Sequence, residues 1–97
     1  MVRIPLSHAE RAQGRALGAC IRRFRGERSP LEIATAASVS PETLRKIETG
    51  RILVPSFATV AKLASALDIS LDELWRAVAV ETDRATEPEG IPDAAIA

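Results

Sequence analysis

The sequence contains a single cysteine, Cys20, which excludes a disulfide framework and a cysteine-based zinc site within one chain. It has no tyrosine, and its aromatic residues are Phe24, Phe57 and Trp75. Because strands draw heavily on aromatic and β-branched residues, this shortage argues against a sheet. No apolar run approaches the length that a membrane-spanning helix needs. Residues 1–5 lack the apolar stretch of a signal peptide, so we expect a cytoplasmic protein that contacts no membrane.

Alanine is abundant, with 17 residues among 97. Alanine favours helices more than any other residue, and a chain of this length buries one modest core. The composition therefore predicts a single all-α domain. The formal net charge of zero hides an asymmetry, since residues 1–51 hold ten Lys and Arg against five Asp and Glu, whereas residues 52–97 hold three against eight. The excess of basic residues in the first half is suited to binding a polyanion, although basic residues scattered over the surface would give the same excess.

The sequence contains clear signals for the N-termini of five helices. Ser-x-x-Glu capping boxes at 7–10, 29–32 and 70–73 mark three helix N-termini, and Ser40 and Ser56 mark two more. Apolar residues recur at helical spacing after each of them. The predicted helices cover residues 8–25, 30–37, 41–49, 57–67 and 71–80. The sequence thus predicts a compact five-helix bundle.

The predicted domain spans residues 7–80, with an N-terminal arm at 1–6. From Glu81 the composition changes, because residues 81–97 hold two prolines, one glycine and a net charge of −4. Such a segment has too little apolar surface to fold alone, so we expect a flexible acidic tail.

A helix over 30–37, a turn at 38–40 and a helix over 41–49 have the dimensions of a helix-turn-helix motif. In that motif the second helix presents its first turns to the major groove of DNA. Leu44 and Ile47 would anchor this helix, and its solvent-facing positions are all polar. They are Glu42, Thr43, Arg45, Lys46 and Thr49. An ordinary amphipathic surface helix has the same pattern, so the spacing alone leaves both interpretations open.

A longer pattern runs through the same region. It comprises Leu17–Arg25, Ile33-Ala34, Val39–Arg51, Pro55-Ser56 and Leu63–Leu74. With this spacing, residues 17–76 resemble the XRE (Cro/phage-repressor-like) family of helix-turn-helix regulators. The resemblance implies a bundle of the lambda-repressor type and a transcriptional regulator that binds double-stranded DNA.

The resemblance also implies roles for individual residues. The positions that reach base edges are matched by Glu42, Thr43, Arg45 and Lys46. Lysine favours guanine O6 and N7, and glutamate accepts from cytosine N4. The positions that bind phosphate are matched by Arg22, Arg28, Ser29, Ser40, Thr49 and Arg51. Glu48 matches a structural glutamate that pairs with an arginine after the first helix, here Arg25 with Arg23 as second choice.

Several positions depart from the family pattern. The linker over 26–28 is shorter than usual, and Pro30 replaces a glutamine that often binds phosphate. Ser38 replaces the usual turn glycine, so it must adopt a positive φ or change the turn. The loop 52–55 is apolar where several relatives are basic, which weakens an expected phosphate contact and offers an edge for a dimer partner.

The remaining conspicuous residues have structural interpretations. His8 has no second metal ligand at suitable spacing, and Cys20 fits a small apolar filler better than a redox switch. Trp75 is predicted to seal the core or, if exposed, to anchor an interface. No nucleophile–base pair, phosphate loop or cofactor motif is present, so we expect no enzymatic activity, cofactor or metal.

Three functions remain open. The leading hypothesis is a sequence-specific regulator that acts as a homodimer on a near-palindromic operator. A variant is the antitoxin of a toxin–antitoxin pair, in which residues 81–97 fold on a basic toxin. The rival from a different class is a protein-interaction module that has lost DNA binding, which Pro30, Glu42 and the apolar loop favour. Salt-dependent affinity for duplex DNA distinguishes the first two from the third.

Overall fold

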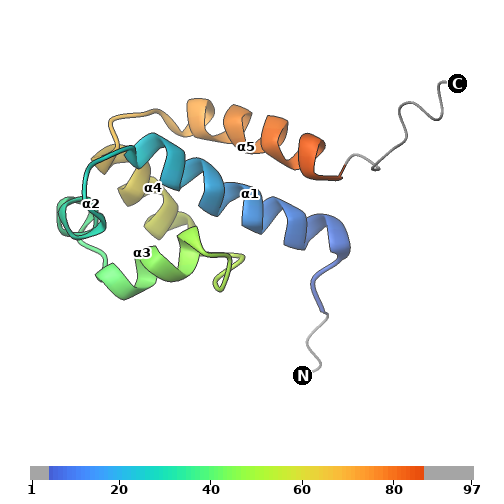
Figure 1. The fold of residues 1–97 in the computed structure, drawn as a ribbon, viewed down its shortest axis with the longest axis horizontal. Coiled ribbons are helices and arrows are strands. Elements are labelled where there is room, and N and C mark those ends of the chain that lie inside the picture. The colour runs from blue at the N-terminus through green and yellow to red at the C-terminus, as the bar shows by residue number, and fades with distance from the viewer. Residues whose placement is uncertain (1–4, 87–97) are drawn as a thin grey trace, which may run out of the picture.

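The computed structural model describes residues 5–86 of the chain. This part consists of five α-helices and contains no strand (Figure 1). The helices are α1 (His8–Arg25), α2 (Pro30–Ala37), α3 (Pro41–Glu48), α4 (Phe57–Ala66) and α5 (Leu71–Thr86). The predicted all-α fold with five helices is therefore confirmed. Within the same residues, no helix is both long and apolar enough to cross a membrane.

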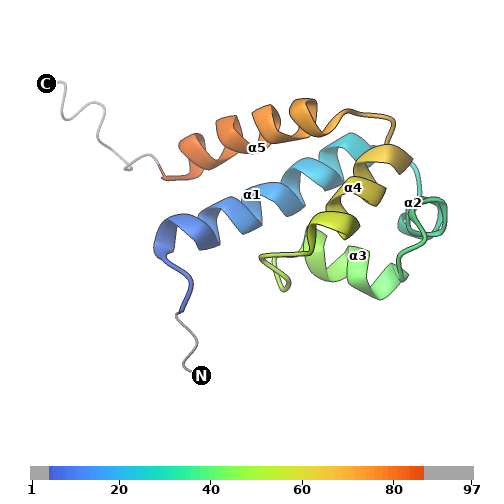
Figure 2. The ribbon, with the colours of Figure 1, turned by 180° about the vertical axis from the view of Figure 1, so that it is seen from behind.

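The two long helices, α1 and α5, lie side by side and run in opposite directions along one side of the molecule. Of the three short helices, α3 packs against α1, α4 packs against α5, and α2 lies against both α3 and α4 (Figures 1 and 2). The N-terminal half of α1 extends beyond them. The helix-turn-helix pair, α2 and α3, lies at the edge of the bundle farthest from α5, so it is open to solvent.

Serine caps fix four of the five helix starts in the predicted way. At Ser7 and Ser70 the capping box is complete, because the serine hydroxyl accepts from the third backbone N–H and the glutamate accepts from the serine N–H. The hydroxyls of Ser40 and Ser56 accept from the backbone N–H groups of Thr43 and Thr59. At the fifth start, Ser29 accepts from the N–H of Glu32, but the Glu32 side chain does not bond back to Ser29, so the capping box predicted at 29–32 is only half formed. A cap of this kind stabilises a helix by about 1 kcal/mol.

Every helix contributes to one apolar core. The largest fully buried side chains are Cys20 and Ile21 from α1, Ile33 from α2, Leu44 and Ile47 from α3, Leu63 from α4 and Leu74 from α5. Among the described residues, no polar or charged residue is fully buried. The core is thus held by apolar contact, which contributes about 25 cal/mol per Å² of surface removed from water.

Two glycines bring α1 unusually close to α3 and to the loop that follows it. A Cβ on Gly18 would overlap the carbonyl oxygen of Ile47 in α3. A Cβ on Gly14 would lie 2.5 Å from the carbonyl oxygen of Leu53. We call this contact line the glycine seam, and it fixes the position of α3 relative to α1.

The predicted start of the tail at residue 81 is wrong, because α5 continues to Thr86. Glu81 lies on the α1 side of this helix, with its carboxylate 3.6 Å from the guanidinium of Arg23 and 3.8 Å from that of Arg84. These ion pairs and the helical hydrogen bonds extend α5 beyond the last large apolar residues. Residues 87–97, and the partner expected to bind them, lie outside the described part.

The prediction that Trp75 seals the core is also wrong. Leu74 and Val78 occupy the core-facing positions of α5, each only 2% exposed. Trp75 follows Leu74 directly, and one residue turns a helix by about 100°. Its side chain therefore projects outward and remains 58% exposed.

Candidate DNA-binding surface

The turn between α2 and α3 is closed by a residue with left-handed backbone geometry. Ser38 has φ 58° and ψ 41°, the conformation that glycine usually supplies at this point of a helix end. The N–H of Val39 donates to the carbonyl of Ala34 at 2.9 Å, which satisfies a carbonyl at the end of α2. Of the two outcomes open for Ser38, the structure has the positive φ, so the turn keeps the tight geometry of the motif.

The first turn of α3 is fixed by hydroxyl groups. Ser40 Oγ accepts from the backbone N–H of Thr43 at 3.0 Å and donates to Thr43 Oγ1 at 2.8 Å. Pro41 occupies the first helical position, where its missing N–H costs nothing. The remaining free N–H groups and the positive end of the helix dipole point out of the bundle, which suits a phosphate group.

The exposed face of α3 carries one acidic and two basic side chains in contact. The Glu42 carboxylate lies 3.9 Å from Arg45 Nη2 and 3.7 Å from Lys46 Nζ. The side chains of Glu42 and Arg45 are each 61% exposed. Exposed pairs of this kind are worth at most about 1 kcal/mol, so they rearrange easily when a stronger partner arrives. The four predicted base-reading residues thus lie within two turns of one exposed helix.

The end of α3 leads directly into a further basic residue. Thr49 caps the helix and its hydroxyl donates to the Arg45 carbonyl at 2.8 Å. The backbone N–H groups of Arg51 and Ile52 both donate to the carbonyl of Lys46, which folds the chain back after Gly50. The Arg51 side chain is exposed on the resulting bend. Its backbone is therefore held firmly while its guanidinium is available to a ligand.

A bidentate ion pair locks the C-terminal ends of α1 and α3 together. Arg25 Nε donates to Glu48 Oε2 and Arg25 Nη2 to Glu48 Oε1, both at 2.8 Å. Both side chains are mostly buried, and Arg25 Nη1 also donates to the Arg28 carbonyl at 2.9 Å. The hydrogen bond to Glu48 raises the pKa of Arg25 above its ordinary value. The predicted partner of Glu48 is present, and Arg23 pairs with Glu81 instead.

The other residues predicted to bind phosphate differ in whether they are open to solvent or already hydrogen-bonded within the chain. The Arg22 side chain is exposed and stands at the edge of a hollow between α1 and α3 that Arg25 and Glu48 also line. Ser29 caps α2 and presents that helix N-terminus to solvent. Arg28 is engaged within the chain, since its guanidinium donates to the carbonyls of Phe24 at 2.9 Å and Arg25 at 3.3 Å.

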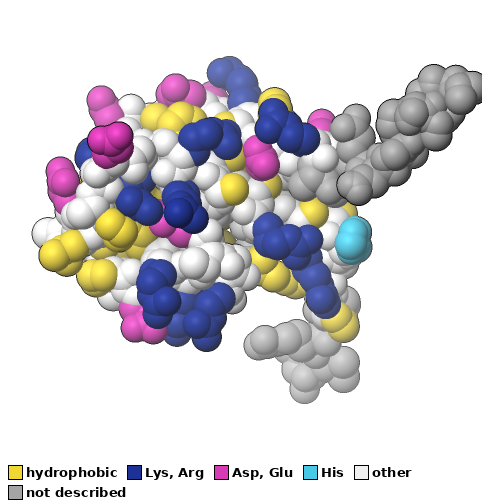
Figure 3. Space-filling view, in the orientation of Figure 1, with side chains coloured by type: hydrophobic (Ala, Val, Ile, Leu, Met, Phe, Trp, Pro, Cys, Tyr) yellow, Lys and Arg dark blue, Asp and Glu magenta, His cyan; other side chains and the backbone are white. Residues whose placement is uncertain are grey.

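Arg11 and Arg15, two arginines that the sequence analysis did not predict, join this surface. Arg11, Arg15 and Arg22 lie at i, i+4 and i+11 on α1, so they follow one line along the helix. Arg15 passes beside Gly50, because a Cβ there would lie 3.4 Å from Arg15 Cγ. In the space-filling view, dark blue side chains gather over α3 and over the N-terminal half of α1 (Figure 3). We call Arg11, Arg15 and Arg22 the basic stripe. Helical spacing alone reveals the stripe, but its contact with the α3 bend depends on the glycine seam.

Cys20 and His8, the residues considered for redox and metal chemistry, keep their structural interpretations. Cys20 is completely buried in the core, and loss of solvation by burial raises the pKa of its thiol. His8 is exposed at the start of α1. Across residues 5–86, no three His, Cys, Asp or Glu side chains come close enough to hold a metal ion.

These features define a helix-turn-helix domain, and comparison with protein families agrees. Residues 16–77 match the model of the family described as "Helix-turn-helix domain", so the chain belongs to that family. The match confirms the resemblance drawn from the sequence. A comparison with curated proteins finds no match.

Two solved structures of the clp gene regulator ClgR from Corynebacterium glutamicum are similar to this chain. The first has a TM-score of 0.75 and 28% identity, covering 93% of this chain and 90% of that chain. The second has a TM-score of 0.65 and 29% identity, covering 82% of this chain and 99% of that one. The family and these similarities together support a DNA-binding transcriptional regulator.

Proposed function

We propose that the protein is a sequence-specific transcriptional regulator that binds its operator as a homodimer, with α3 in the major groove. The observation that carries this proposal is the exposed polar face of α3, held rigidly by the Ser40 cap at one end and the Arg25–Glu48 pair at the other. A reading helix must be fixed in this way, because a small displacement breaks the hydrogen bonds that distinguish one base from another.

In this proposal the exposed residues of α3 contact different base edges. Lys46 donates to guanine O6 and N7, and Glu42 accepts from cytosine N4. Thr43 and Arg45 contact neighbouring base edges from the same two turns. The weak ion pairs of Glu42 are exchanged for contacts to bases, at little cost because they are exposed.

Phosphate groups on both sides of the groove would be held by a second set of groups. The N-termini of α2 and α3, capped by Ser29 and Ser40, offer backbone N–H groups. Thr49 and Arg51 lie at the end of α3, and the basic stripe extends the positive surface along α1. Arg28 joins them only if its guanidinium leaves the carbonyl groups at the end of α1.

The test is fluorescence anisotropy of the pure protein with the DNA upstream of its own gene and with a scrambled duplex, at two salt concentrations. We expect tighter binding to the upstream DNA and a linear loss of affinity with the logarithm of salt, since phosphate contacts release counterions. Equal binding to both duplexes would contradict sequence-specific reading. No binding even at low salt would contradict the DNA-binding function and favour a protein-interaction module.

A further inference from the structure

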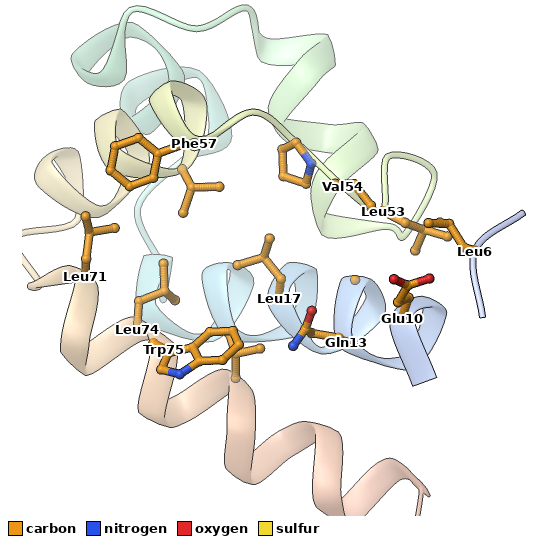
Figure 4. A pocket seen from close by; sticks show the side chains of 14 residues that line it. Leu6, Glu10, Gln13, Leu17, Leu53, Val54, Phe57, Leu71, Leu74 and Trp75 are labelled. Atoms are coloured by element: carbon orange, nitrogen blue, oxygen red, sulfur yellow. The ribbon is translucent and has the colours of Figure 1, made fainter. Parts of the chain in front are cut away.

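The loop that follows α3 offers a single cation to DNA. Across residues 49–56, Arg51 is the only basic residue. Ile52 packs against the core. The next three side chains line an apolar groove on the side of α1 that faces away from the basic stripe (Figure 4), and they are Leu53, Val54 and Pro55. Apart from Arg51, the side chains of the loop are therefore directed away from a phosphate at the end of α3.

Two arginines of α1 lie directly beside this loop. Arg15 packs its aliphatic part along the bend at the end of α3, since a Cβ on Gly50 would lie 3.4 Å from Arg15 Cγ. Arg11 lies one turn nearer the start of α1, and its Nε donates to the Leu6 carbonyl at 3.3 Å. That bond leaves both terminal amino groups of Arg11 open to a ligand. Both arginines are exposed, and neither forms an ion pair within residues 5–86.

We infer that the N-terminal half of α1 takes the place of the loop and binds the DNA strand that passes the end of α3. Arg15 and Arg11 bind two successive phosphates of this strand, next to the phosphate bound by Arg51. This arrangement rests on the proposed function, in which α3 occupies the major groove, and it assigns each arginine to a particular part of the DNA.

The dimensions of the two helices favour this arrangement. The eight residues of α3 span about 12 Å, close to the width of the major groove, so the ends of α3 lie near the two bordering strands. The strand at the C-terminal end passes the bend at Arg51 and then meets α1, whose N-terminal half extends beyond the short helices (Figure 1). Four residues of helix advance about 6 Å, so Arg11 and Arg15 are spaced like neighbouring phosphates of one strand.

Gly14 is the positioning residue for these arginines. A Cβ on Gly14 would lie 2.5 Å from the carbonyl oxygen of Leu53 and 2.7 Å from its Cβ, so only glycine lets α1 lie directly on the loop. Arg15 follows Gly14 and projects about 100° further round the helix, at the edge of this contact. The helix α3 is held elsewhere, by Gly18 and by the buried ion pair at its C-terminal end. A change at Gly14 should therefore move the arginines more than it moves the reading helix.

The first test compares the wild type with an Arg11→Ala/Arg15→Ala variant in anisotropy titrations on the upstream DNA at about 50 and 200 mM salt. Losing two phosphate contacts reduces the slope of log affinity against log salt by about two units per protomer, so this rise in salt should weaken the variant about tenfold less for each bound protomer. Both positions are exposed and alanine favours a helix, so circular dichroism should show unchanged helix content. The matched control, Arg76→Ala/Arg84→Ala, removes two charges from exposed positions of α5 and should keep the wild-type slope.

The second test locates the phosphates with duplexes that carry one uncharged methylphosphonate linkage at successive positions. Two adjacent positions on one strand should weaken the wild type and leave the Arg11→Ala/Arg15→Ala variant unaffected, and the next position should behave in this way for Arg51→Ala. Gly14→Ala should lose sensitivity at the two α1 positions but keep its preference for the upstream DNA over a scrambled duplex. A merely structural defect would instead weaken binding at every position alike.

An unchanged slope for Arg11→Ala/Arg15→Ala, with selective binding of the upstream DNA retained, would overturn the inference and leave the proposed function intact. Sensitive positions that are not adjacent, or that lie on different strands, would also overturn it, because α1 would then not follow one strand. So would a loss that depends on the A·T content of nearby base pairs, since the arginines would then enter the minor groove. Equal binding of the wild type to the upstream and scrambled duplexes, with the two-unit difference in slope retained, would contradict sequence-specific reading alone.

Discussion

The two sides of α1 border surfaces with opposite chemistry, although they are only one helix diameter apart. On one side the basic stripe continues into the exposed face of α3 and the bend at Arg51. On the other side lies an apolar groove of about 480 Å³ between α1, the loop after α3, the start of α4 and α5, with Phe57 and Trp75 exposed on its rim (Figure 4). The glycine seam runs between them and holds both in one rigid arrangement.

The contrast shows how one small domain presents two surfaces that differ in chemistry. Charge-based contacts to phosphate weaken steeply with salt, whereas burial of apolar surface does not. The two surfaces should therefore respond differently to the same change of conditions. Substitutions that disturb the shared scaffold should affect both, and substitutions on one surface should spare the other.

The largest effect is expected from Glu48→Ala, which breaks the scaffold beneath both surfaces. It leaves the mostly buried guanidinium of Arg25 without its partner, and loss of one member of a buried pair costs about 3–5 kcal/mol. Because some solvent reaches both side chains, we expect a value near the lower end. Urea unfolding, followed by circular dichroism, measures the change in free energy.

Glu42→Ala is the control for this prediction, since it removes an exposed glutamate from the same helix. Its loss should cost no more than about 0.5 kcal/mol, because exposed pairs contribute little. Equal destabilisation by the two substitutions would show that the Arg25–Glu48 pair does not lock α1 to α3.

Gly18→Ala should have the next largest effect, because it forces a Cβ into the glycine seam against the backbone of Ile47. Overpacking of this kind costs about 1–3 kcal/mol, even though alanine by itself favours a helix over glycine. We expect lower stability together with weaker DNA binding, since α3 must shift relative to the basic stripe. Ala19→Ser, at an exposed neighbouring position, should change the unfolding free energy by less than about 0.5 kcal/mol. A stabilised Gly18→Ala variant would mean that the seam is loose.

Lys46→Ala acts on one surface alone. It should cost about 1–3 kcal/mol on the upstream DNA and relax the preference for that DNA over a scrambled duplex. The protein should remain folded and keep its oligomeric state, because Lys46 points away from the core and the groove. Lys62→Ala on α4 is the matched control and should leave affinity unchanged. A preserved preference in anisotropy titrations would remove Lys46 from the base-reading residues.

The parts of this structure that local chemistry determines could be predicted from the sequence. Serine caps and apolar spacing define the helix starts, and the fit of Arg25 to Glu48 follows from the family resemblance. The end of α5 was missed because residues 81–86 are acidic and polar, yet ion pairs between Glu81 and two arginines support the helix there.

What sequence reasoning could not supply depends on how the helices pack. The outward position of Trp75 is set by which face of α5 meets α1, and periodicity does not distinguish adjacent residues at the edge of that face. Likewise, the contact between Arg15 and the bend at Gly50 arises from the close approach that Gly14 and Gly18 permit. The groove, and the contact between the basic stripe and the α3 bend, are thus properties of the packed bundle.

The smallest effects, and the sharpest comparison of the two surfaces, come from removing single phosphate contacts. Arg51→Ala and Arg15→Ala should each weaken binding to any duplex alike and reduce the slope of log affinity against log salt by about one unit per bound protomer. Arg84→Ala removes the same charge from α5, distant from α3, and should leave the slope unchanged. An unchanged slope for Arg15→Ala beside a reduced one for Arg51→Ala would end the DNA-binding surface at the α3 bend. Reduced slopes for both would extend it onto α1, because only a residue that lies beside a phosphate releases a counterion when it binds.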